Sequence, residues 1–124
     1  MQFVSLHNQT HPKQKPIRAG YCSSFFCRLR GLMFRRSLSK HEGLLLVQPR
    51  SDRMDASIHM MFMRFDLAVI WLDETLKVVD VRLAKQWRPA YFPAKAAKYI
   101  LETHVDRLND FQPGDQVSLE PCEK

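Results

Sequence analysis

The chain has 124 residues, a length that fits one domain and can bury a core without metals or disulfides. Hydrophobic residues make up 45% and charged residues 26%, which excludes a disordered chain. The longest apolar run, residues 67–72, is too short to cross a bilayer, and residues 1–6 lack the pattern of a signal peptide. We therefore expect one cytoplasmic domain over residues 1–124, with its core in residues 17–120 and a strand plus a mobile arm in residues 1–16.

The net charge of +6 is unevenly distributed. Residues 1–41 contain eight of the 19 basic residues and none of the 13 acidic ones. A basic N-terminal third is typical of a surface that steers an anionic partner, although a solvated, solubilising surface has the same pattern.

The three cysteines cannot all pair within one chain. Cys22 and Cys27 are five residues apart rather than in a Cys-x-x-Cys motif, and no second pair completes a zinc site. This spacing favours reduced cysteines with a structural role, and we expect neither a metal nor a cofactor.

The N-terminal part predicts two short strands followed by a helix. Residues 2–6 and 17–22 are the strands, and the polar, proline-containing residues 7–16 form the loop between them. Ser23 or Ser24 can cap a helix that runs to about residue 34. Its apolar side, expected to cover one face of a sheet, consists of Phe25, Phe26, Leu29, Leu32 and Met33. A glycine at position 31 suggests close backbone packing there.

The middle of the chain predicts four strands. Residues 43–47 are continuously apolar, residues 56–63 alternate, and residues 67–72 are apolar on both faces like a central strand. A hairpin turn at residues 73–77 leads into an alternating strand at residues 78–84. The side chains of this last strand expected to point inward are Val79, Val81 and Leu83.

The C-terminal part is less regular. Residues 87–93 are rich in aromatic residues and proline and predict a loop, which either lines a pocket or plugs the core. Residues 94–108 have features of both a helix and a strand. A turn at residues 111–115 precedes a last strand at residues 116–120.

Three segments together resemble the family known as domain of unknown function 192. They are residues 28–35 (Arg-Leu-Arg-Gly-Leu-Met-Phe-Arg) with 43–46, residues 58–65 running into 69–73 and 78–81, and residues 99–102 with 113–117. The resemblance implies a compact, barrel-like antiparallel sheet with short helices. It also implies a strand at residues 99–103 and a short helix near residues 105–110. The family implies no reaction.

Two departures from the family pattern concern polar groups. Many relatives have Trp-Met-Lys-Asn-Thr near the place where this chain has His59–Met63, and many have an Asp where this chain has Ala68. A polar site built from those family groups is therefore in doubt in this chain.

No catalytic motif stands out. The chain has no Gly-x-Ser-x-Gly elbow and no glycine-rich phosphate loop. Three methionines at positions 60, 61 and 63 could bind Cu(I), but Met also fills irregular cores, and we favour that interpretation. His59 is the best single candidate for chemistry, and the alternative is a histidine with a structural hydrogen bond.

We therefore predict a small α+β domain that is mainly β, with an antiparallel barrel-like sheet and one or two short helices. The leading functional hypothesis is a non-catalytic binding or interaction domain with a basic, aromatic-rimmed surface. Its candidate binding residues are Arg28, Arg30, Arg35, His59, Arg64, Trp87, Arg88 and Tyr91. The partner is an anionic ligand, a nucleic acid or a protein, and not a membrane. The alternatives are a small enzyme that uses His59 as acid or base, and weak nucleic-acid binding through residues 13–40.

Overall fold

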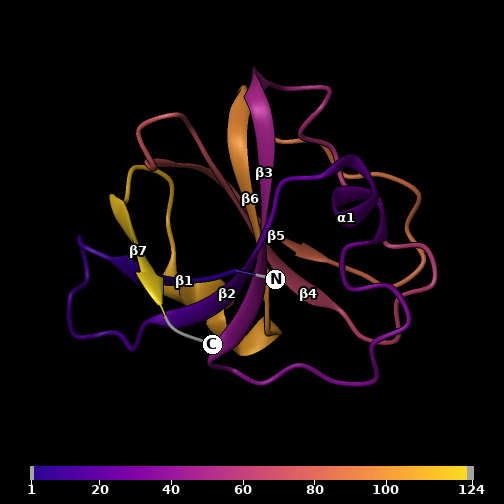
Figure 1. Ribbon diagram of the computed structural model, residues 1–124, viewed down its shortest axis with the longest axis horizontal. Helices are drawn as coiled ribbons and strands as arrows, with labels where there is room; N and C mark the ends of the chain where they lie inside the picture. Colours follow the sequence, from indigo (N-terminus) through magenta and orange to yellow (C-terminus); the bar gives the residue numbers. More distant parts are fainter. Residues whose placement is uncertain (1, 123–124) are drawn as a thin grey trace.

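A computed structural model describes residues 2–122 of the chain. Seven strands form one sheet in the order β5-β4-β6-β3-β2-β1-β7 (Figure 1). The strands are β1 (Phe3–Asn8), β2 (Ile17–Cys22), β3 (Glu42–Asp52), β4 (Leu67–Leu72), β5 (Val78–Ala84), β6 (Ala97–Thr103) and β7 (Val117–Cys122). The short helix α1 (Phe25–Arg30) and the 3₁₀ helix η1 (Val105–Asp110) complete the fold. The predicted α+β class with a dominant sheet is confirmed.

The sheet is mixed and open, so the prediction of an antiparallel, barrel-like sheet is wrong in both details. β2 and β3 pair in parallel, whereas every other neighbouring pair is antiparallel. A parallel pair requires a crossover connection, and here the crossover between β2 and β3 carries α1. The edge strands β5 and β7 meet only near their first residues, through a single bridge between Lys77 and Gln116 and a few nearby hydrogen bonds.

Several strands follow directly from local sequence patterns. The bounds predicted for β2, β4 and β5 are confirmed, and the turn between β4 and β5 is fixed by the Asp73 carboxylate, which accepts N–H bonds from Thr75 and Lys77. The family resemblance correctly assigned residues 99–103 to a strand and residues 105–110 to a short helix. The loop at residues 87–93 is also confirmed.

Each face of the sheet carries its own hydrophobic core. The first core includes Leu6, Ile17, Leu45, Ile70, Leu101, Phe111 and Val117. The second core lies on the opposite face, under α1 and the connections before β3 and β4, and includes Leu32, Leu38, Leu46, Ile58, Met60, Met63, Trp71 and Ile100. Because β4 is covered on both faces, all six of its residues are buried.

The expected strand at residues 56–63 does not form. This segment is irregular. Ile58 forms a single bridge with Tyr91, and the Met60 backbone makes isolated hydrogen bonds with Trp87 and Arg88. Phe62 has a φ of 62°, which a strand does not permit. The alternation instead reflects individual side chains, among them Met60 and Met63, that enter the second core from an irregular segment.

The expected packing of the helix is also wrong. α1 ends at Arg30, buries no side chain, and leaves Phe25 64% and Phe26 79% exposed. The helix ends early because Gly31 has a φ of 52°, a conformation that L-residues rarely adopt. Leu32, just beyond the helix, enters the second core in their place.

Two smaller expectations fail as well. Leu83 is 40% exposed, because the edge strand β5 is only partly covered at this point. Cys22 and Cys27 form a disulfide rather than staying reduced, since one turn of chain brings their Cα atoms to 5.6 Å, a separation that a disulfide can span. Cys122 is free. None of the helices described is long and apolar enough to cross a membrane.

Candidate functional site

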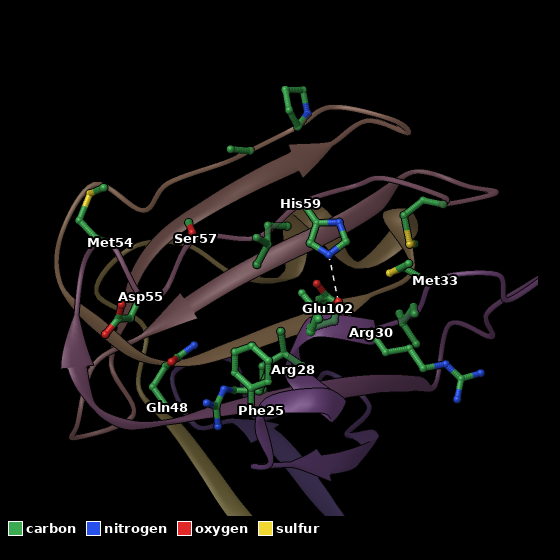
Figure 2. A pocket seen from close by; sticks show the side chains of 18 of the residues that line it. Phe25, Arg28, Arg30, Met33, Gln48, Met54, Asp55, Ser57, His59 and Glu102 are labelled. Atoms are coloured by element: carbon green, nitrogen blue, oxygen red, sulfur yellow. Dashed lines mark hydrogen bonds between the residues drawn. The ribbon is translucent and has the colours of Figure 1, made fainter.

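A cavity of about 500 Å³ lies between α1 and the second face of the sheet (Figure 2). Its walls combine apolar and polar surface and come from α1, from the segment after α1, from strands of the sheet and from the irregular segment before β4. The apolar part includes Leu29, Leu32, Leu46, Ile58 and Met63. Polar and charged side chains also line it, namely Arg28, Arg30, Gln48, Asp55, Ser57, His59 and Glu102. This mixture of apolar walls and a few polar groups is typical of small-molecule sites.

Glu102 is the most unusual residue of the cavity. It lies on β6, opposite Leu44 of β3 and Val69 of β4, and its side chain is only 4% exposed. Its Oε1 atom has no hydrogen-bond partner, and the carboxyl takes part in no ion pair among residues 2–122. Burial raises the pKa of Glu102 from 4.5 to about 7, because the apolar surroundings disfavour the charged carboxylate.

Gly31 makes room for this carboxyl. A Cβ atom at position 31 would lie 3.2 Å from Glu102 Oε1, closer than ordinary van der Waals contact. The same glycine ends α1 with its positive φ, so one residue both stops the helix and lets the chain pack closely over Glu102 Oε1, which has almost no accessible surface. The close packing expected at Gly31 is therefore confirmed, and its partner is Glu102.

A second polar group on the same sheet face is Gln48. It lies on β3 two residues after Leu46, which packs in the second core, and it is 6% exposed. Its side chain makes no hydrogen bond to any other described residue, and it lines the cavity with Glu102. The cavity therefore contains a carboxyl and an amide whose hydrogen-bonding capacity the surrounding protein leaves unused.

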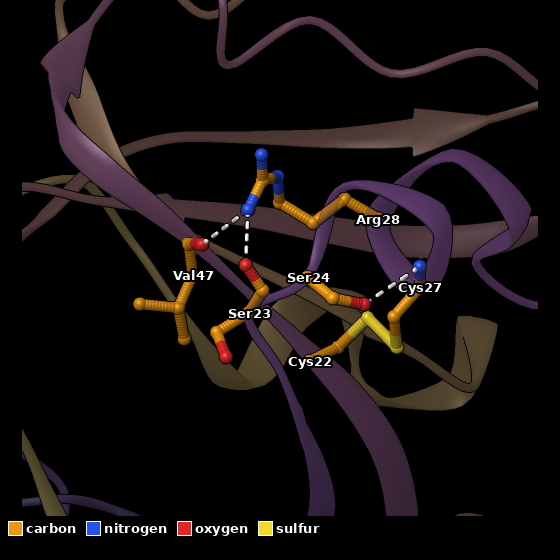
Figure 3. The surroundings of a disulfide bond; sticks show 6 residues. All are labelled: Cys22, Ser23, Ser24, Cys27, Arg28 and Val47. Carbon is orange, nitrogen blue, oxygen red and sulfur yellow. Dashed lines mark hydrogen bonds between the residues drawn. A yellow bond between two sulfur atoms is a disulfide. The ribbon is translucent and has the colours of Figure 1, made fainter.

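α1 forms a wall of the cavity, and polar contacts hold it in place (Figure 3). The Ser24 hydroxyl caps the helix by accepting the Cys27 N–H at 3.2 Å, and the disulfide ties Cys27 to the end of β2. The Arg28 guanidinium donates to the carbonyls of Ser23 and, at 3.3 Å, Val47 of β3. These contacts substitute for the buried side chains that α1 lacks.

His59 also holds α1, because both of its ring nitrogens contact the backbone. Nδ1 accepts the Met61 N–H at 3.3 Å, so the ring proton resides on Nε2, which donates to the Leu29 carbonyl at 2.9 Å. The ring lines the cavity, but neither nitrogen is free to take a proton from a ligand. This arrangement is typical of a structural histidine.

The candidate binding residues do not form a single surface. Arg28, Arg30 and His59 line the cavity beside Glu102. Arg64 and Trp87 line a separate hollow with Phe34 and Phe62.

The other three candidates lie outside both hollows. Arg35 forms an exposed ion pair with Glu42 at 3.3 Å, and Arg88 is exposed. The Tyr91 hydroxyl accepts the Lys85 N–H, and its backbone pairs with Ile58. We find no contact that gives these three residues a shared role.

The separate hollow is lined by an exposed aromatic cluster, formed by Phe34, Phe62 and Trp87. Their rings contact one another with centroid distances of 5.3 and 5.1 Å, and the side chains are 55%, 45% and 54% exposed. All three residues have a positive φ between 62° and 66°, which is uncommon outside glycine and costs free energy. The loop at residues 87–93 therefore does not plug the core with Trp87.

Glu102 and Gln48 were missed as site residues in the sequence. Glu102 has one local signal, since it is the sole charged residue of the predicted strand at residues 99–103. Gln48 follows four apolar residues of β3 and has no comparable signal. In the part of the chain that the structure describes, no three His, Cys, Asp or Glu side chains gather as potential metal ligands.

Comparison with known proteins places this chain in a family. The family model DUF192, described as "Uncharacterized ACR", matches residues 6–119. The chain belongs to this family. It is 40% identical over 119 residues to a UPF0127 protein of Thermococcus kodakarensis, covering 94% of this chain and 74% of that protein. It is 39% identical over 95 residues to a UPF0127 protein of Pyrococcus furiosus, covering 77% and 78%.

Two solved structures share the fold of this DUF192 chain. One, described as a putative transcription regulator from Sinorhizobium meliloti, has a TM-score of 0.81 and 18% identity over 95% of this chain and 92% of that one. The other is a protein of unknown function from Novosphingobium aromaticivorans, with a TM-score of 0.78 and 19% identity over 94% and 83%. These likenesses establish the fold alone.

Proposed function

We propose that this DUF192 protein is a small-molecule-binding domain whose ligand occupies the cavity and hydrogen-bonds to Glu102 and Gln48. The observation that carries this proposal is the buried Glu102 carboxyl without a partner. An unpaired buried carboxyl lowers the stability of the folded protein by several kcal/mol, and an apolar residue at position 102 would avoid this cost. A ligand that supplies the missing hydrogen bonds explains why a carboxyl is found at this position.

The dimensions of the cavity support a small organic ligand. Its volume of about 500 Å³ lies within the range of roughly 300–1,000 Å³ that is usual for such sites. Leu46 and Ile58 offer apolar contacts, while the two unpartnered polar groups can fix the orientation of the ligand. The floor of the cavity is formed by strands rather than loops, so these groups are already in place before a ligand arrives.

The test uses five six-carbon probes and the NMR spectrum of ¹⁵N-labelled protein. The probes are hexanol, hexanamide, hexylamine, hexanoate and 6-aminohexanoate. We expect at least one of them to shift the backbone amides of Gly31, Gln48 and Glu102. The variant Leu29→Trp, which fills the mouth of the cavity, should abolish these shifts.

Phe26→Trp is the matched control, because Phe26 lies on the same helix but does not line the cavity. It should respond to the probes as the wild-type protein does. If no probe shifts the three amides, or if Leu29→Trp responds normally, the proposal of a binding cavity is wrong.

Catalysis by His59 receives less support from the geometry. Both ring nitrogens contact backbone groups, so the imidazole would have to break one of these bonds to act as an acid or base. We therefore propose binding rather than catalysis for this cavity.

Weak binding of single-stranded nucleic acid is a second candidate function. Phe34 and Trp87 are exposed aromatic side chains beside Arg64, and bases can stack on such rings while arginine contacts the phosphates. We expect Trp87→Ala to weaken binding of a fluorescent oligothymidylate severalfold, whereas Phe26→Ala should not. If several phosphates are contacted, the affinity should fall by about tenfold or more between 50 and 200 mM salt. A smaller loss of affinity would contradict this candidate.

A further inference from the structure

The cavity is lined by an acidic and a basic side chain that each lack an oppositely charged partner. Glu102 is buried on β6 and has no partner at Oε1. Arg28 is half-buried on α1, and its guanidinium donates only to backbone carbonyls, those of Ser23 and Val47 (Figure 3). Neither residue takes part in any ion pair of the described chain, although both line the same cavity (Figure 2).

We propose that the ligand of this cavity is a dipolar molecule, with an ammonium group against Glu102 and a carboxylate or phosphate against Arg28. This inference rests on the proposed binding function and names the class of ligand. The part of the ligand between its charged ends is apolar, because the same cavity is also lined by Leu46 and Ile58. Such a molecule supplies each uncompensated charge with its missing partner.

A ligand with a single charge fits the cavity less well. A cation alone would satisfy Glu102 but would meet Arg28 and, at the rim, the exposed Arg30. An anion alone would satisfy the arginines but would leave the buried carboxyl without a partner. Asp55, the other acid at the cavity, is exposed, so water screens its charge. The imidazole of His59 is occupied by the Leu29 carbonyl and the Met61 N–H.

Both charged groups are held in position before a ligand binds. Glu102 lies on β6 between β3 and β4, and its place is fixed by strand pairing on both sides. The Arg28 guanidinium is held by two carbonyls from two different segments, and this uses one terminal nitrogen while leaving the rest of the planar fork available. Less side-chain ordering is then needed when a ligand binds.

The experiment measures binding by isothermal titration calorimetry at pH 8, where most of Glu102 is ionised. The dipolar probes are 4-aminobutanoate, 6-aminohexanoate and 8-aminooctanoate, and the alkylamine and the alkanoate of each length are the one-ended controls. We expect the best aminoalkanoate to bind at least tenfold more tightly than either of its one-ended counterparts.

Two variants assign the ends of the ligand. Glu102→Gln should weaken binding of the best aminoalkanoate at least tenfold without weakening the alkanoate. Arg28→Gln should likewise weaken the best aminoalkanoate at least tenfold without weakening the alkylamine. Arg36→Gln is the control, since Arg36 is exposed and does not line the cavity. Arg28→Lys preserves the charge if Arg28→Gln disturbs α1, and it should retain binding within severalfold.

The outcomes separate this inference from the proposed function. If an alkylamine or an alkanoate binds as tightly as the aminoalkanoates, the cavity binds ligands but their dipolar class is wrong. Equal affinities in wild type and Glu102→Gln also overturn the dipolar ligand. If no probe shifts the cavity amides in the NMR experiment, both proposals fall together.

Discussion

Two regions of the molecule contain buried charged side chains, and they treat them in opposite ways. Arg107 of η1 is 7% exposed, and its guanidinium donates to Asp110, to the Lys40 carbonyl and to the Lys15 carbonyl. Glu102, five residues earlier, is buried to a similar degree and has no partner at Oε1. In the first region, the Arg107 cluster, hydrogen bonds hold three segments of chain together. In the second region, the protein provides no hydrogen-bond donor for Glu102 Oε1.

A neighbouring group extends the contrast. Asp115 is 6% exposed and accepts hydrogen bonds from the Asn8 side chain at 2.9 Å and from the Gln112 N–H at 3.0 Å. Both partners are in place within the protein, so this carboxylate is accounted for by the fold. The difference teaches that burial alone does not make a charged residue a candidate for function, and that the absence of a partner does.

The largest expected effect comes from breaking the Arg107 cluster. Arg107→Met should lower the free energy of unfolding by about 4 kcal/mol, because it leaves the Lys15 and Lys40 carbonyls and the Asp110 carboxylate without their donor. Urea denaturation followed by circular dichroism measures this change. A loss below about 1 kcal/mol would show that water replaces the guanidinium and that the cluster does not hold the fold together.

Removing the Glu102 carboxyl should have the opposite effect and raise the free energy of unfolding, by an amount that depends on pH. Its pKa is about 7 in the folded protein against an ordinary 4.5, so the folded state holds its proton more tightly than the unfolded state does. The destabilisation is therefore absent below about pH 4.5, grows as the pH rises to 7 and is complete above it, where it amounts to about 3 kcal/mol. Glu102→Gln should remove this loss, so the variant should be more stable than wild type at pH 8.

The measurement is urea denaturation of both proteins at pH 5 and pH 8. Glu74→Gln, which changes an exposed acid in a turn, is the control and should follow the wild-type pH profile. Parallel profiles for wild type and Glu102→Gln would mean that the carboxylate is solvated in the cavity, which would remove the contrast with the Arg107 cluster.

The disulfide should have an intermediate effect, confined to the cavity side of the molecule. Cys27→Ser should lower the free energy of unfolding by about 2 kcal/mol, as the loop-entropy model gives for a short closed loop. It should also speed amide hydrogen exchange in α1, which has no buried side chain to hold it. Cys122→Ser, at a free cysteine, is the control. Equal effects of the two substitutions would show that the disulfide does not support the cavity wall.

The sequence predicted the sheet well wherever one strand has a distinct pattern of its own. Residues 67–72 are apolar on both faces and residues 78–84 lie after a clear turn, so local chemistry determined these strands. The failures arise where tertiary contacts decide. Residues 56–63 alternate like a strand, but no neighbouring strand is available along their length. Phe25 and Phe26 lie on a helix too short to bury them.

The cavity was only partly predictable for the same reason. The arginines of α1 and His59 were recognised as candidates from residue type, and the structure brings them to one cavity. Glu102 carries the site because it lacks a partner, and a missing partner cannot be seen in a sequence. The register that sets Glu102 opposite Leu44, under Gly31, depends on β3 pairing with β6 across more than 50 residues of chain.

The smallest expected effect concerns an ion pair at the surface of the protein. Arg35 pairs with Glu42 at 3.3 Å, but both side chains are more than 40% exposed, so water screens the pair. Arg35→Met should therefore change the free energy of unfolding by less than about 0.5 kcal/mol, although it makes the same chemical change as Arg107→Met. Urea denaturation of the two variants under the same conditions compares their free energies of unfolding directly. A loss at Arg35 as large as that at Arg107 would mean that the positive charge itself, and not its buried hydrogen bonds, stabilises this fold.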